Sequence, residues 1–272
     1  MKWIPALALI SIAGANDTSI NSGAHGPAPL GEFKAEESIV RMVSETIDIR
    51  FGKTESKVTC KFTFRSAKKG GDAKQTVGFP DLLETDSDTG QIRKLETFID
   101  GKMVEAKKIR GWFATSEWGT PKSGFGEPPK FLGEDDVQFA NFFAVDVSFP
   151  PDKDVVIERR YVADNGADTM GTRWFTYTTH TGAVWRGTIG KAEFRVTLDG
   201  MTVDDLAFED GPQKLEPRKQ FEWCSPNKAE WTVKSPTELT MTWENFEPAV
   251  HQTRRGIKIS TWAQAMLGAE GD

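Results

Sequence analysis

Residue types that usually carry out chemistry are scarce in this chain of 272 residues. It contains three histidines and two cysteines, which leaves little material for a multi-ligand transition-metal site. His180, directly before a Thr-Gly pair, is the best-placed histidine. Neither a Gly-x-Ser-x-Gly elbow nor a His-Glu-x-x-His helix occurs. The sequence therefore favours a non-enzymatic protein without a cofactor, and a hydrolase that uses His180 with nearby carboxylates is an alternative.

The run from Thr181 to Gly190 is the most distinctive in the chain, because glycines surround Trp185. Glycine allows tight bends and close approach of the backbone. Trp185 then either covers a ligand or packs flat against a neighbouring strand, and glycine-rich strands more often do the latter. This hairpin is the first candidate contact surface. Together with other aromatic and basic residues it gives the set of candidate ligand-binding or partner-binding residues: Trp112, Trp118, Arg173, Trp174, Tyr177, His180, Trp185 and Arg186.

A second candidate surface is the aromatic segment 111–136, which is rich in glycine and proline. A long loop of this kind is often functional. Its rings, Trp112 and Trp118 among them, could stack on sugars, which gives a carbohydrate-binding module as an alternative function. The competing interpretation is that these rings cover one end of a β-sandwich, as large aromatic side chains usually do.

Two acidic loops resemble parts of calcium sites. Asp86 and Asp88 alternate before a glycine, and Asp164 and Asp168 flank an Asn-Gly pair. Both loops lack the remaining ligands of an EF-hand loop, and acidic residues are common in turns because they bond to the local backbone. We regard these four residues as weak calcium candidates and otherwise expect no metal site.

The two cysteines allow a single disulfide bond. Cys60 shares one strand face with Val58, Phe62 and Phe64, whereas Cys224 lies before a Ser-Pro-Asn turn. A bridge between Cys60 and Cys224 would close a long loop, and an oxidising compartment would permit it. The alternative is two unpaired thiols, with Cys60 buried and unreactive.

The first fifteen residues match a secretory signal peptide. Lys2 is followed by a short apolar stretch and by Ala13-Gly14-Ala15, a small-residue cleavage site. We therefore expect a periplasmic or extracellular protein without a transmembrane segment, since no later stretch is apolar enough to span a bilayer. The net charge of −6 argues against a nucleic-acid partner, and leaves an envelope protein or a glycan as the expected partner.

Short runs of alternating apolar and polar residues dominate the chain beyond residue 39. Clear examples end at Phe51, Phe64 and Leu198, and Asp100-Gly101 is a strong hairpin signal. Such strands predict an all-β fold, an antiparallel β-sandwich with a short C-terminal helix at 261–267. It forms either one domain or two packed β-subdomains, 16–150 and 151–272, that meet near Pro150-Pro151.

Several motifs resemble a bacterial family of secreted domains of unknown function. Asn16-Asp17-Thr18 resembles the start of the mature chains of this family. Tyr177 to Gly190 resembles its Tyr-x-x-x-Thr-Gly-x-x-Trp-x-Gly-x-Ile-Gly motif, and Trp243 to Pro248 its Trp-x-Asn-Phe-x-Pro element. The resemblance implies a secreted, mostly-β bacterial protein and supplies no catalytic residues. We therefore expect an exported, non-enzymatic binding or structural protein of the cell envelope.

Overall fold

The computed structural model describes residues 24–30, 39–82, 92–114, 122–125, 127, 137–179, 182, 185–207, 230–247 and 256–262. Their regular structure consists of β-strands, apart from short 3-10 turns such as Val203–Asp205. This confirms the all-β class. Of the expected C-terminal helix at 261–267, the structure describes residues 261 and 262, and Thr261 forms an isolated β-bridge with Leu206. The rest of that segment lies outside the described residues. No helix in the described ranges has the length and apolar character that crossing a bilayer requires.

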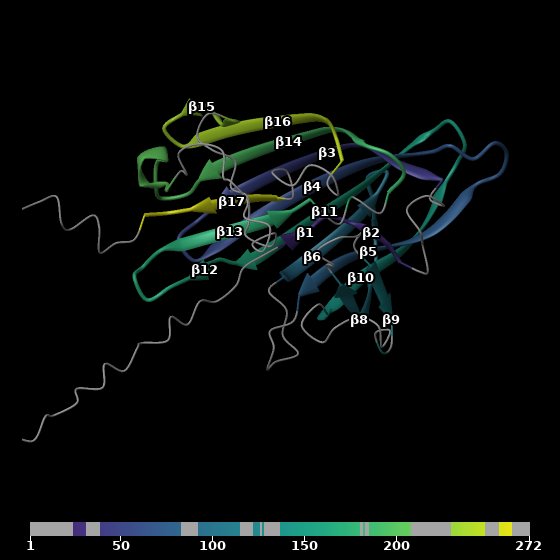
Figure 1. The fold of residues 1–272 in the computed structure, drawn as a ribbon, viewed down its shortest axis with the longest axis horizontal. Helices are drawn as coiled ribbons and strands as arrows, with labels where there is room; N and C mark the ends of the chain where they lie inside the picture. The colour runs from purple at the N-terminus through teal and green to yellow at the C-terminus, as the bar shows by residue number, and fades with distance from the viewer. Residues whose placement is uncertain are drawn as a thin grey trace, which may run out of the picture.

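One layer of the fold is an eight-stranded sheet (Figure 1). Neighbouring strands in this sheet are antiparallel, except for β14 and β3, which run parallel. In spatial order its strands are β15 (Thr232–Ser235), β16 (Glu238–Phe246), β14 (Ile189–Leu198), β3 (Val40–Phe51), β4 (Glu55–Ser66), β11 (Asp154–Asp164), β6 (Ile92–Ile99) and β7 (Lys102–Val104).

Two smaller sheets form the other layer. In the five-stranded sheet the order is β2 (Ala28–Leu30), β5 (Ala73–Leu82), β10 (Val137–Phe149), β8 (Lys107–Ala114) and β9 (Lys122–Phe125). In the four-stranded sheet, β13 (Arg173–Thr178) pairs with β1 (Ala24–His25), β12 (Gly166–Ala167) and β17 (Gly256–Ser260).

Both small sheets pack against the same face of the large sheet. Phe64 on β4 meets Phe149 of the five-stranded sheet at 5.8 Å between ring centroids. Phe194 on β14 meets Tyr177 of the four-stranded sheet at 6.4 Å. The predicted inward positions of β4, from Val58 to Phe64, are all at most 2% exposed. The β-sandwich is therefore confirmed, with one core that all three sheets share.

The large sheet also bears on the domain organisation. Strands from before and after Pro150-Pro151 are interleaved in it, since β3 and β4 lie between β14 and β11. The main core cluster likewise runs from Val40 to Ile259. In the described part of the chain, strands from both sides of Pro150-Pro151 thus contribute to one sheet and to one core cluster.

Two local predictions need correction. The hairpin at Asp100-Gly101 forms, with both residues at positive φ, but its second arm ends at Val104 and the chain continues into β8 of another sheet. The segment 111–136, predicted as a loop, begins within β8 and contains β9, which pairs antiparallel with it. Glycines and prolines hid this hairpin because they weaken the alternating pattern of a strand.

Candidate functional site

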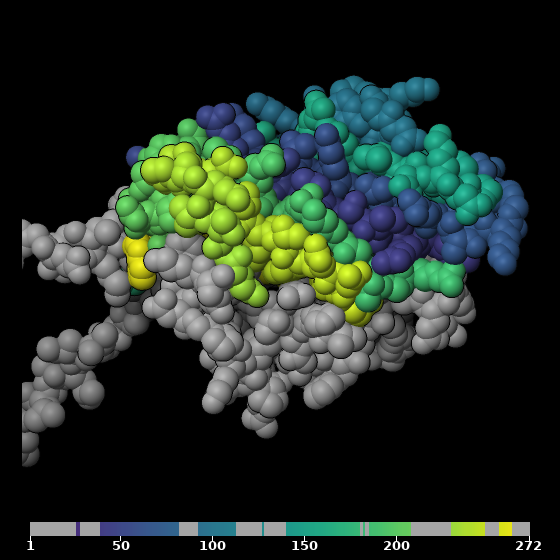
Figure 2. All heavy atoms as spheres, turned by 90° about the horizontal axis from the view of Figure 1, so that it is seen from above, coloured from purple at the N-terminus to yellow at the C-terminus, as the bar shows by residue number. Residues whose placement is uncertain are grey.

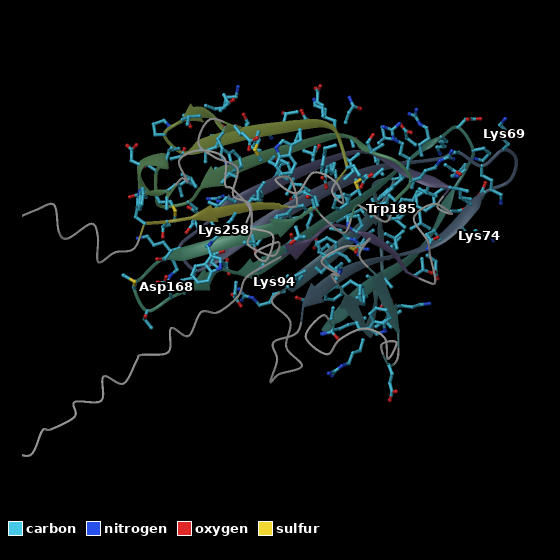
Figure 3. All side chains as sticks on the ribbon, viewed as in Figure 1. Lys69, Lys74, Lys94, Asp168, Trp185 and Lys258 are labelled. Carbon is cyan, nitrogen blue, oxygen red and sulfur yellow. The ribbon has the colours of Figure 1, made fainter. Side chains whose placement is uncertain are left out.

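Trp185, the centre of the predicted contact surface, lies in the core. Its side chain is 2% exposed, and its ring is 4.6 Å from that of Phe64 between centroids. The indole Nε1 donates a hydrogen bond of 2.8 Å to the carbonyl oxygen of Pro27. Figure 3 shows Trp185 among the strands. The prediction that Trp185 forms a binding surface is therefore wrong, and its interpretation as a core residue is correct, because the glycines around it let the ring pack inwards.

Two other predicted contact residues are also buried. Trp112 is 6% exposed on β8, and Tyr177 is fully buried on β13. A surface role for these rings is therefore wrong, since a side chain within the core cannot contact a ligand outside. Trp118 and His180 lie outside the described residues.

The remaining three candidates are accessible but do not form one constellation. Arg173 and Trp174 are half-buried neighbours on β13, and Lys258 lies 5.5 Å from the centroid of the Trp174 ring. Arg186 is exposed and follows Trp185, and its backbone N–H donates to the carbonyl oxygen of Val40 on β3. Arg173 and Trp174 thus lie on β13, whereas Arg186 lies beside β3.

The calcium candidates within the described residues have other partners. Asp164 forms an ion pair with Arg93 at 2.5 Å. Asp168 closes its own turn, since one carboxylate oxygen accepts hydrogen bonds from the backbone N–H groups of Met170 and Thr172. The described residues contain no group of three potential ligands, and the calcium prediction for Asp164 and Asp168 is corrected. Asp86 and Asp88 lie outside the described residues.

Cys60 is fully buried in the core and has no disulfide partner among the described residues. Its Sγ lies 4.0 Å from the hydroxyl oxygen of Tyr161. Burial raises the pKa of Cys60 well above its ordinary value, so the reactive thiolate does not form at neutral pH. Cys224 lies outside the described residues, and the bridge to it stays a prediction.

The outward face of the large sheet carries a feature that the sequence did not reveal. Outward residues of neighbouring strands pair in rows, which the register defines. We call Arg195, Asp48, Thr59 and Arg160 the first row, on β14, β3, β4 and β11. The second row, two residues further along each strand, is Thr197, Arg50, Lys57 and Val162.

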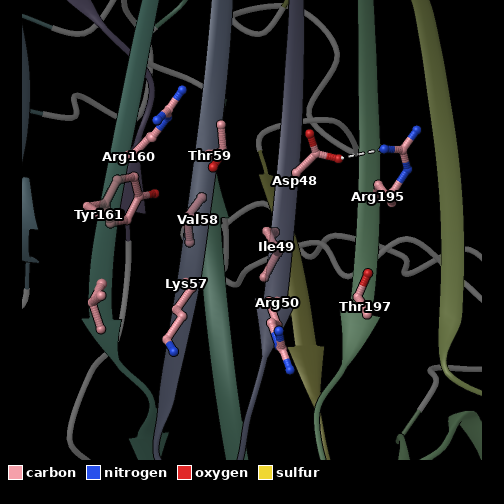
Figure 4. Close-up of a pocket in the computed structure, with 11 residues that line it drawn as sticks. Asp48, Ile49, Arg50, Lys57, Val58, Thr59, Arg160, Tyr161, Arg195 and Thr197 are labelled. Carbon is pink, nitrogen blue, oxygen red and sulfur yellow. Dashed lines mark ion pairs between the residues drawn. The ribbon is translucent and has the colours of Figure 1, made fainter. Parts of the chain in front are cut away.

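These two rows line a hollow of about 430 Å³ (Figure 4). A smaller hollow of about 190 Å³ adjoins it at the turn between β3 and β4; the two share Arg50 and Lys57, and Lys53 and Asp199 belong to the smaller one alone. Seen from above, the strands that form this face lie beside one another, from the yellow-green of β16 and the green of β14 to the purple and blue of β3 and β4 (Figure 2). The site is thus a surface depression across four strands.

The hollow is cationic although the protein is acidic. Its lining includes four basic side chains, Arg50, Lys57, Arg160 and Arg195, against one carboxylate, Asp48. Three further carboxylates, Asp199, Glu158 and Glu238, pair with the arginines from beside the lining, so Lys57 is the base of the lining without a carboxylate partner among the described residues. The whole chain has a charge of −6. A patch of opposite sign to the rest of the protein attracts anions to one place on its surface.

Carboxylates hold the three guanidinium groups in position. Arg195 lies 3.2 Å from Asp48, as the dashed line in Figure 4 marks. Arg50 lies 3.0 Å from Asp199, and Arg160 lies 2.6 Å from Glu158. The three guanidinium side chains are 52–59% exposed, so each can also meet a ligand. Ion pairs at this exposure fix orientation more than they add stability.

Lys57 differs from the arginines, because it makes no ion pair with another residue described in the structure. It lies between Arg50 and Val162 in the second row, beside Thr59 of its own strand. Its ammonium group and the hydroxyls of Thr59 and Thr197 can donate hydrogen bonds to carboxylate or phosphate oxygens. The arrangement is therefore suited to binding anions.

Sequence reasoning missed this face because its residues are far apart in the chain. Arg195 lies 147 positions after Asp48 and meets it through the parallel pair β14–β3. The available signal was the alternation itself, which already assigned Asp48 and Arg50 to the outward side of β3. The pairing of strands, which brings the rows together, could not be derived from alternation.

Comparison with known proteins identifies the fold. No family model matches the chain, and no curated protein matches its sequence. Among solved structures, a "putative nutrient binding protein" from Legionella pneumophila superposes with a TM-score of 0.58 at 18% identity, over 90% of this chain and 72% of that one. The two chains share a fold.

Two further structures match less well. An M1 zinc metallopeptidase from Deinococcus radiodurans gives a TM-score of 0.37 at 8% identity, over 82% of this chain and 42% of that one. Leukotriene A4 hydrolase from Saccharomyces cerevisiae gives 0.37 at 8% identity, over 85% and 31%. Likenesses at this TM-score bear on neither fold nor function.

Proposed function

We propose that this chain is an exported, non-enzymatic binding protein of the bacterial cell envelope, and that it binds an anionic ligand in the hollow of the large sheet. The observation that carries the proposal is the cationic lining of that hollow in a protein of net charge −6. Lys57, which has no carboxylate partner among the described residues, is the central cation of the site.

Two further observations support the proposal. The first fifteen residues have the layout of a secretory signal peptide, which favours export. The protein with which the chain shares its fold has a name that describes nutrient binding. The lining offers hydrogen-bond donors and positively charged groups for an anion, which supports a binding role.

Glycan binding through exposed aromatic rings has less support. Trp112, one of the two tryptophans named for stacking, is buried and cannot take part. Trp174 remains half-exposed, but Lys258 lies against its ring. The cationic hollow is therefore the stronger site.

Isothermal titration calorimetry of the purified protein at low salt tests the proposal, with citrate, inorganic pyrophosphate, polygalacturonate and neutral dextran as probes. We expect at least one anion to bind and dextran not to bind. Lys57→Glu should weaken that binding about tenfold, because it replaces an attractive contact with a repulsive one. Lys69→Glu, an equal charge change at the exposed β4–β5 turn (Figure 3), should change it less than twofold. Absence of binding to all anions, or equal effects of both variants, would overturn the proposal.

A further inference from the structure

This inference rests on the proposed function and concerns the class of ligand. We infer that the ligand is a linear acidic polysaccharide, a hydroxyl-bearing chain with repeated carboxylates, which lies across the strands of the large sheet. The extent, exposure and mixed polarity of the two rows lead to it.

The cationic surface is longer than a small anion needs. The first row extends over four strands from Arg195 to Arg160, and at about 4.8 Å between strands this is about 14 Å. The path then continues through Arg50 and Lys57 into the second hollow, which adds the cation of Lys53 and the carboxylates of Glu55 and Asp199, so this end of the path offers both charge and hydrogen-bond acceptors. A ligand that meets all of these groups must itself be extended.

The site is also too exposed to hold a small molecule. Small-ligand sites bury most of the surface of their ligand, whereas the side chains of Arg50, Arg160 and Arg195 are each more than half exposed. Each of these arginines already has a carboxylate partner, so a single anion gains little at any one of them. Several weak contacts along one chain combine into useful affinity because the later contacts are intramolecular.

The lining mixes cations with an acceptor, which suits a sugar better than a polyphosphate. The side chain of Asp48 is 40% exposed and lies 3.2 Å from Arg195. The exposed part of this carboxylate can accept a hydrogen bond from a ligand hydroxyl. The hydroxyls of Thr59 and Thr197 can both donate and accept. A polyphosphate would be repelled by Asp48 and would offer it no donor.

The two rows lack the features of the other polyanion partners. Protein interfaces depend on buried apolar and aromatic anchors, and Val162 is the one apolar side chain in either row. Single-stranded nucleic acids bind by stacking on aromatic rings. Neither row contains a ring, and the guanidinium of Arg160 lies 4.5 Å from the centroid of the Phe98 ring beside it.

The test measures affinity against ligand length. Galacturonate monomer, trimer and hexamer are titrated into the purified protein by calorimetry, together with a hexaglutamate peptide, a DNA hexanucleotide and polyphosphate of similar charge. We expect the hexamer to bind at least about tenfold more tightly than the monomer. The hexamer should also bind more tightly than the hexaglutamate, the DNA hexanucleotide and the polyphosphate, because none of these three combines sugar hydroxyls with carboxylates. Lys57→Gln should lower the salt dependence of hexamer binding by about one in the log–log slope, and Lys69→Gln should not.

The outcomes separate this inference from the proposed function. If none of the probes binds, the proposed function fails. If citrate or the galacturonate monomer binds as tightly as the hexamer, or if peptide, DNA or polyphosphate binds more tightly, the inference fails while the anionic site stands. Circular dichroism of the two lysine variants checks that their folds are unchanged, as we expect for substitutions of exposed side chains.

Discussion

Replacing Glu45 with glutamine should remove a pH dependence from the stability of this protein. Glu45 lies on the inward face of β3, between Phe62 of β4 and Ala192 of β14, and is 2% exposed. Its Oε1 accepts no hydrogen bond from the described residues. Burial raises the pKa of Glu45 from 4.5 to about 8, because the charged form loses its hydration.

The direction in which stability changes with pH follows from proton binding by Glu45 in the folded and unfolded chain. Below pH 4.5 the carboxyl is protonated in both the folded and the unfolded chain, so the stabilising difference is fully present there. Between pH 4.5 and about 8 the unfolded chain releases the proton while the folded one keeps it, and stability falls as pH rises. At about 1.4 kcal/mol per pH unit, the loss reaches about 3 kcal/mol at pH 7 and about 5 kcal/mol above pH 8.

Urea unfolding followed by tryptophan fluorescence measures this effect from pH 4.5 to pH 8.5. Glu45→Gln keeps the shape and cannot ionise, so the variant should gain stability over the natural chain as pH rises, by about 3 kcal/mol at pH 7. Glu193→Gln is the control, since the side chain of Glu193 is 48% exposed on the opposite face, and it should leave the pH dependence unchanged. A constant difference between Glu45→Gln and the natural chain across this range would refute the reasoning.

Three further substitutions test the placement of buried and turn residues in the same urea assay. Trp185→Ala should lower the free energy of unfolding by about 3–5 kcal/mol, because it leaves a cavity in the core. A loss below about 1 kcal/mol would contradict the burial of that ring. Arg159 is fully buried, and burial lowers its pKa to about 10, so it is charged at neutral pH. Because no carboxylate among the described residues pairs with it, Arg159→Met should be neutral or stabilising, and a loss of several kcal/mol would contradict this. Asp168→Ala should cost about 1 kcal/mol through its two backbone hydrogen bonds; if calcium protected the natural chain from unfolding but not this variant, the assignment of Asp168 to a purely local turn would be wrong.

The alternating pattern predicted the faces of the long strands correctly. Val58, Cys60, Phe62 and Phe64 point into the core as expected, because burial requires one face of each strand to be apolar. Glu45 escaped the same reasoning because an acidic side chain is not expected on an apolar face, although its position alternates in step with Ile47, Ile49 and Phe51. The register shift between Met42 and Ser44 lies before Glu45 and brings Val40 and Met42 onto the same buried face. A bulge of this kind adds a residue to one strand and reverses its alternation, and nothing in the local sequence marks it.

The local sequence around Trp185 does not show whether its ring is exposed or buried. The glycines around Trp185 allow a ring that covers a ligand as well as one that packs against a strand, and the structure places the ring against Phe64 with its Nε1 bonded to the carbonyl oxygen of Pro27. The partner oxygen comes from residues 24–30, which pair with both small sheets through β1 and β2. That contact spans 158 positions, so local composition could not show that the indole has a partner inside the fold.

The outward face is where the chain was free to vary, because folding requires those positions only to be polar. The next row along the same four strands shows what an ordinary solvated row looks like: Glu193, Thr46, Lys61 and Glu158 carry two acids and one base. The first two rows, by contrast, carry four bases and one acid on the same strands. Folding and solubility do not require this change of sign over a distance of two residues, since mixed charges would serve both. Ion pairs with neighbouring carboxylates account for the three arginines of these rows. Lys57 has no such partner among the described residues, and the proposed anionic ligand would supply one.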